Sequence, residues 1–135
     1  MPEDLQLTPA EAVRLAQRLI DDGRPFHAHE VLEATWKSSP ADQRALWKGL
    51  AQIAVGLTHA RRGNSRGAVS LLRRGAAAVD GSIGGAGAGA GLQTTVPPGL
   101  DLHAIVASTT ELADVIAARG LDAVPPGDLS VQLSG

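Results

Sequence analysis

The helix start and stop signals constrain the fold of this chain more than any other feature of its sequence. Thr8 and Glu11 have the spacing of a capping box, and Pro9 stands at the first helical position, where its missing N–H costs no hydrogen bond. Gly23 ends this helix, and Pro25 begins the next, which runs to about residue 37. Signals of the same kind predict three more helices, over residues 41–62, 66–79 and 102–119.

The composition agrees with a helical fold. Hydrophobic residues make up 44% of the chain but aromatic residues only 2%, so leucine, alanine, valine and isoleucine must fill most of the core. Runs of β-branched and aromatic residues, which favour strands, are nearly absent. A chain of 135 residues is expected to form one domain with a sizeable core. We therefore predict an all-α fold, a compact bundle of roughly four to five helices with antiparallel helical hairpins.

A glycine-rich segment divides the chain. Residues 81–99 read GSIGGAGAGAGLQTTVPPG, and glycine both costs backbone entropy and offers no side chain to pack. A phosphate-binding loop is disfavoured, because these glycines follow a predicted helix instead of a strand. The predicted organisation is a helical core domain over 1–80, a flexible linker over 81–100, a C-terminal helix packing on the core over 101–120, and a tail over 121–135. This tail is expected to be frayed after the proline pair at 125–126.

Charge and cysteine content exclude several classes of protein. The net charge of −2 argues against nucleic acid as the main partner, because phosphate binding needs a basic face. The absence of cysteine excludes disulfides, thiolate zinc sites and cysteine nucleophiles. No run approaches the ~18–20 apolar residues of a membrane span, and the acidic N-terminus does not resemble a signal peptide. The expected location is therefore the cytoplasm, with no membrane partner.

The stretch FHAHEVLEATW, residues 26–36, carries the candidate chemistry. His29, Glu33 and Trp36 stand at i, i+4 and i+7, so they share one face of the helix predicted over 25–37. That face falls in the apolar sector, whereas His27 and Glu30 fall in the opposite one. We therefore expect His29, Glu33 and Trp36 to be largely buried and His27 and Glu30 to be exposed.

The helix predicted over 41–62 supplies a matching stripe. Gly49, Gln52, Gly56 and His59 stand at i, i+3, i+7 and i+10 along one of its edges. A glycine inside a helix costs roughly 1 kcal/mol relative to alanine, so two on one stripe indicate close approach of a neighbouring backbone. We expect that neighbour to be the helix over 25–37, with Gln52 buried and level with His29.

Two interpretations of these polar residues remain open. In one, His29 and Glu33 hydrogen-bond each other and Gln52, and this network sets the register of two helices, with Phe26 beside it in the core. In the other, His29 and Glu33 bind a divalent metal ion, with His59 or Gln52 completing the ligand set. HEVLE lacks the second histidine of HExxH, so the pattern does not fit a zinc protease of that class.

The combined pattern resembles the domain of unknown function 309 family of small bacterial and archaeal helical proteins. The resemblance extends over roughly residues 16–77 and rests on FHAHEVLEATW, on KGLAQIA at 48–54, on HARRGNSRGA at 59–68 and on the leucine pair at 71–72. It implies an all-α fold and an HxxxExxW motif that has been suggested to bind metal, without an established activity. The motif residues would be His29, Glu33 and Trp36, and the residues expected to support the motif are Phe26, Trp36, Gly49, Gly56 and Asn64.

Two classes of function follow. The first is a protein that binds a divalent metal ion of unknown identity; if it is an enzyme, a metal-dependent hydrolase is the first guess. The second is a non-catalytic interaction or oligomerisation module, with a second copy of the chain as the expected partner. Five arginines near the junction of two predicted helices are expected to form a solvated face, with an anion-binding patch as the less favoured reading: Arg61, Arg62, Arg66, Arg73 and Arg74.

Overall fold

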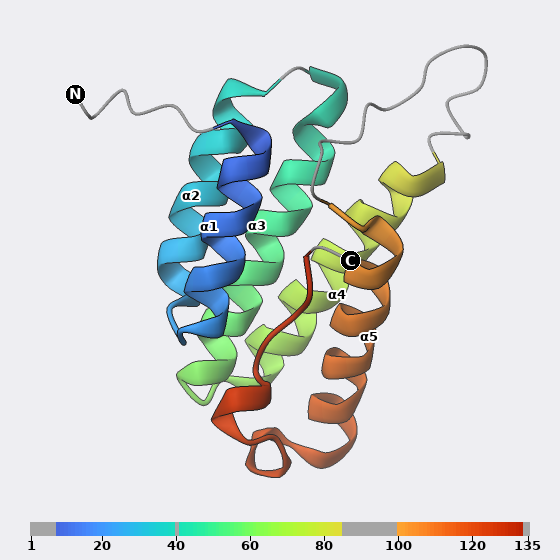
Figure 1. The fold of residues 1–135 in the computed structure, drawn as a ribbon. Coiled ribbons are helices and arrows are strands. Elements are labelled where there is room, and N and C mark those ends of the chain that lie inside the picture. Colours follow the sequence, from blue (N-terminus) through green and yellow to red (C-terminus); the bar gives the residue numbers. More distant parts are fainter. Residues whose placement is uncertain (1–7, 40, 85–99, 134–135) are drawn as a thin grey trace.

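The computed structural model describes residues 8–39, 41–84 and 100–133, and these residues form helices and no strand. The elements are α1 (Pro9–Asp21), α2 (Pro25–Ser38), α3 (Ala41–Arg61), α4 (Ser65–Gly84), α5 (Leu102–Arg119), and the short 3₁₀ helices η3 (Leu121–Ala123) and η4 (Pro126–Asp128). Each α-helix packs on the one that follows it in the chain (Figure 1). The predicted all-α bundle is therefore confirmed.

The predicted boundaries of α1, α2, α3 and α5 agree closely with the structure, whereas α4 continues to Gly84 instead of ending at residue 79. The predicted capping groups of α1 are present. The Thr8 N–H donates to Glu11 Oε1 at 2.8 Å, and the Glu11 N–H donates to Thr8 Oγ1 at 3.1 Å. The hydrogen bond from the Thr8 backbone, followed by that with its side chain, lowers the pKa of Glu11 below its usual value. Gly23, Gly63 and Gly120 adopt φ values of 79°, 84° and 83°, the left-handed conformation that lets a helix end in a sharp turn.

The helical glycines mark a close approach between α3 and α4. A Cβ atom placed on Gly75 of α4 would lie 2.6 Å from the Gly49 carbonyl oxygen of α3. A Cβ atom on Gly56 would lie 3.0 Å from Leu72 Cγ. The expectation of close approach is thus confirmed, but α2 was the wrong neighbour: the glycine stripe of α3 faces α4. The spacing of glycines along one helix indicates that another helix packs closely on it, but it does not indicate which helix.

The end of α4 reaches into the segment predicted to be a linker. Residues 81–84 continue the helix, and the remainder of the glycine-rich segment, residues 85–99, lies outside the described residues. α5 packs on α4 through a buried stripe that includes Ile105 and Ile116. The C-terminal helix α5 therefore lies against α4.

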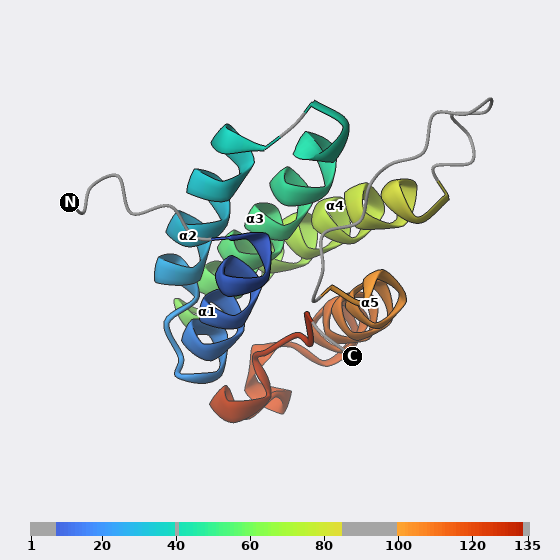
Figure 2. The ribbon, with the colours of Figure 1, turned by 45° about the horizontal axis from the view of Figure 1, so that its top comes forward.

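The segment after η4 is ordered, and the prediction of a frayed tail is wrong for residues 129–133. Leu129, Val131 and Leu133 are buried, and Figure 2 shows their segment running between α1 and α5. Gln17 of α1 holds the segment with both ends of its side-chain amide. Its Nε2 donates to the Val131 carbonyl oxygen at 3.0 Å, and its Oε1 accepts from the Leu133 N–H at 2.7 Å. The Asp101 N–H donates to the Leu133 carbonyl oxygen at 3.0 Å.

Candidate functional site

Two neighbouring stripes of α2 have different surroundings. Pro25, Ala28 and Leu32 form the buried stripe that faces the core. The stripe one residue further along is only partly covered by the neighbouring helices, and it contains Phe26, His29, Glu33 and Trp36. Because one residue turns the helix by about 100°, this second stripe lies at the margin of the core. His27 and Glu30 are exposed, as predicted.

Phe26 corrects one part of the prediction. Its side chain was expected in the core, but it is 47% exposed. Its ring centroid lies 5.7 Å from that of His29 and 6.2 Å from that of His27. Phe26 shares the stripe of His29, so it reaches the surface beside the imidazole instead of entering the bundle with Pro25.

The motif residues line a small cleft of about 180 Å³ between α2 and α3, with one contribution from α4. Gln52 lines the same cleft from α3, so it lies near the motif residues of α2. Most of the remaining surface is apolar, apart from the Lys48 side chain. The full lining consists of His29, Glu33, Trp36, Lys48, Ala51, Gln52, Val55 and Leu71.

His29 and Glu33 face each other without a hydrogen bond. His29 Nε2 lies 3.9 Å from Glu33 Oε2, and the two side chains are 22% and 42% exposed. His29 Nδ1 is buried and has no hydrogen-bond partner. Trp36 and Gln52 are partly buried as well, so the prediction that these four residues are largely buried holds only in part. Among the residues that the structure describes, no hydrogen bond joins His29, Glu33 and Gln52, so the predicted register-setting network does not form.

His59 lies at the junction of α3 and α4 and does not line the cleft. Its Nδ1 atom is 3.0 Å from Asn64 Nδ2, and Asn64 Oδ1 accepts the Gly67 N–H at 3.0 Å near the start of α4. A Cβ atom on Gly67 would lie 2.7 Å from Asn64 Nδ2 and 3.2 Å from His59 Cγ. The contacts of His59 and Asn64 therefore stabilise the turn between two helices. The structure does not bring His59 to His29 and Glu33.

His29 and Glu33 belong to no larger cluster of histidine and carboxylate ligands, and the rest of the described chain forms none either. Across residues 8–39, 41–84 and 100–133, no group of three or more His, Cys, Asp or Glu side chains could hold a metal ion. The arginines at the α3–α4 junction are exposed, and Arg73 Nη2 lies 3.1 Å from Asp114 Oδ1 of α5. Within the same described ranges, no helix combines the length and the hydropathy needed to cross a bilayer.

The described residues form a small all-α protein with a cleft between α2 and α3. The sequence model of the family named domain of unknown function (DUF309) matches residues 13–71, and the predicted resemblance to this family is thereby confirmed over that region. Every residue that lines the cleft lies inside the matched region. α5 and the C-terminal segment lie outside it.

One curated relative shows how far the sequence similarity extends. The chain is 46% identical over 48 residues to "Uncharacterized protein YpuF" of Bacillus subtilis (strain 168). This alignment covers 35% of the present chain and 28% of the relative, so the similarity concerns a short part of a longer protein. No solved structure matches the chain significantly.

Proposed function

We propose that the cleft between α2 and α3 binds a divalent metal ion through His29 and Glu33. The observation that carries this proposal is the 3.9 Å separation of Nε2 and Oε2, two donor atoms that face each other without a hydrogen bond. Ligand atoms at about 2.0–2.2 Å from one ion can be separated by at most about 4.2 Å. An ion between them can therefore reach both atoms.

Gln52 is the third protein ligand in this proposal. Its side-chain amide lines the same cleft from α3, and a carbonyl oxygen is a suitable donor for ions that accept imidazole and carboxylate. A set of two or three protein ligands leaves coordination positions for water. Trp36 and Leu71 line the cleft beside these groups and limit the access of solvent. The Lys48 ammonium lines it too, and its positive charge weakens cation binding there.

Added metal is expected to stabilise the protein. If the folded state alone binds the ion, stability rises by RT ln(1 + [L]/Kd), or about 2.7 kcal/mol at one hundred times Kd. The measurement is the melting temperature at neutral pH with Zn²⁺, Mn²⁺, Ni²⁺ or Fe²⁺. The shift should disappear in His29→Ala and should diminish on acidification, because a protonated imidazole cannot bind a metal.

His27→Ala is the matched control for the metal experiment. His27 is exposed on the same helix and does not line the cleft, so its removal should leave the metal-induced shift intact. An equal loss of the shift in His27→Ala and His29→Ala would indicate binding to surface histidines. The proposal would be contradicted if none of these ions changed the melting temperature and the purified protein contained no metal.

Self-association is the second candidate function, and the exposure of Phe26 favours it. This phenylalanine is the large hydrophobic residue that is 47% exposed, and it borders the cleft through its contact with His29. A second copy of the chain could cover both the ring and the margin of the bundle. Light scattering coupled to size exclusion should then show a dimer that Phe26→Ser converts to a monomer. A parent protein that is monomeric at high concentration would exclude this function.

A further inference from the structure

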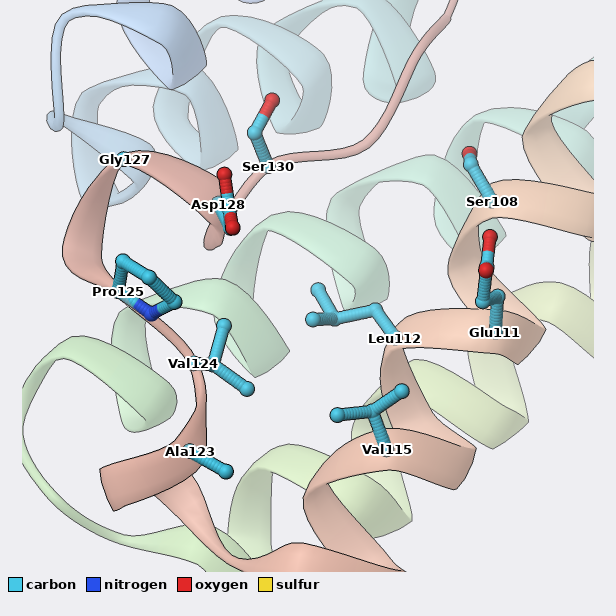
Figure 3. Close-up of a pocket in the computed structure, with 10 residues that line it drawn as sticks. All are labelled: Ser108, Glu111, Leu112, Val115, Ala123, Val124, Pro125, Gly127, Asp128 and Ser130. Atoms are coloured by element: carbon cyan, nitrogen blue, oxygen red, sulfur yellow. The ribbon is translucent and has the colours of Figure 1, made fainter.

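A larger pocket, separate from the cleft of the motif, lies between α5 and the C-terminal segment (Figure 3). Its volume is about 450 Å³, within the range of pockets that hold small organic molecules. Leu112 and Val115 point from α5 towards Val124 across the pocket and give it an apolar floor. The whole lining lies outside residues 13–71, so this pocket belongs to the part of the chain that the family match does not cover.

Two carboxylates stand at the margins of this apolar floor. Glu111 comes from α5 and Asp128 from η4, so they lie on different walls of the pocket (Figure 3). Neither carboxylate forms a hydrogen bond or an ion pair with a residue in the part of the chain that the structure describes. No lysine, arginine or histidine lines the pocket.

The two hydroxyl groups of the lining are already engaged. Ser108 Oγ accepts the Gln132 N–H at 3.3 Å, and Ser130 Oγ donates to Asp21 Oδ1 at 3.4 Å. These contacts fix the C-terminal segment against α5 and α1, so the walls are set by the fold. The side-chain charges that remain available to a ligand are the two carboxylates.

We propose that this pocket binds an aliphatic diamine. One ammonium group would pair with Glu111 and the other with Asp128, while the methylene chain lies on Leu112, Val115 and Val124. Charge and shape both support this class of ligand: the pocket offers negative charge on two walls and an apolar surface between them. A monoamine would use one carboxylate only, and an anion would find no positive group. This site is independent of the metal site proposed above.

Titration with three five-carbon probes tests the proposal. Cadaverine carries two ammonium groups, pentylamine carries one, and pentanol carries none. The affinities, measured from backbone amide chemical shifts, should fall in the order cadaverine, pentylamine, pentanol. The shifts should be largest at residues of α5 and η4, and added salt should weaken the binding of cadaverine because salt screens exposed charges. Equal affinity for cadaverine and pentanol would overturn the proposal.

Substitutions that remove one carboxylate charge at a time test which residues bind the ammonium groups. Glu111→Gln and Asp128→Asn should each weaken cadaverine binding about two- to fivefold, the effect typical of one exposed ion pair. Glu30→Gln is the matched control, because Glu30 is an exposed carboxylate on α2 that does not line the pocket. The melting temperatures of all three variants should match that of the parent, since none of these side chains is buried. Equal weakening by Glu30→Gln and Glu111→Gln would mean that cadaverine responds only to net charge, and the pocket assignment would be wrong.

Discussion

Replacing Gly75 with alanine is expected to lower the free energy of unfolding by about 2–3 kcal/mol, because an added side chain overpacks the contact between α3 and α4. A Cβ atom at this position would lie 2.5 Å from Ile53 Cγ1 and 2.6 Å from the Gly49 carbonyl oxygen. Backbone atoms cannot move aside as the end of a flexible side chain can, so the two helices must separate. Unfolding in urea, followed by circular dichroism, measures the change.

Gly81 provides the control on the same helix. A Cβ atom on Gly81 would meet nothing within 4 Å, so Gly81→Ala should raise stability by up to about 1 kcal/mol through helix propensity alone. Gly49→Leu should destabilise the protein for the same reason as Gly75→Ala, since even its Cβ would lie 2.7 Å from Ala78 Cβ. If Gly75→Ala and Gly81→Ala shift the urea midpoint in the same direction, the contact between α3 and α4 does not restrict the size of the side chain at position 75.

The second large effect is expected at the end of the described chain. Leu133→Ala should lower the free energy of unfolding by about 2–4 kcal/mol, because Leu133 is 1% exposed and its removal leaves a cavity in the core. Gln132→Ala, one residue away, should change stability by less than about 0.5 kcal/mol because its side chain is exposed. Equal and small effects of both substitutions would show that residues 129–133 do not pack on the bundle in solution.

The helix ends could be predicted because the signals that set them are local. A capping box, a proline at the first position and a left-handed glycine act within one helical turn, so the sequence alone contains them. The sequence also contains a pattern that predicts the ordered C-terminal segment. Leu129, Val131 and Leu133 alternate with polar residues, the period of an extended strand-like segment with one buried face.

The candidate site could be predicted only in part. The helical spacing placed His29 and Glu33 on one face, and Gln52 lines the same cleft although the glycine stripe used to position it faces α4. The burial of these side chains depends on how far the neighbouring helix extends over them. The residue pattern of one helix does not contain this information. The prediction that His59 joins the site was wrong for the same reason. Its side chain contacts Asn64 at the start of α4 instead of the residues of α2.

The amide of Gln17 connects the first described helix to the last described segment, so α1 and residues 131–133 are expected to unfold locally together. α1 cannot leave the bundle without releasing residues 131–133, and these residues cannot detach without exposing Gln17. The exchange of the Leu133 amide proton with solvent therefore reports the opening of α1, although more than one hundred residues separate them in sequence. Since Ser130 and Asp128 of the same segment line the pocket beside α5, a ligand bound there should also slow this exchange.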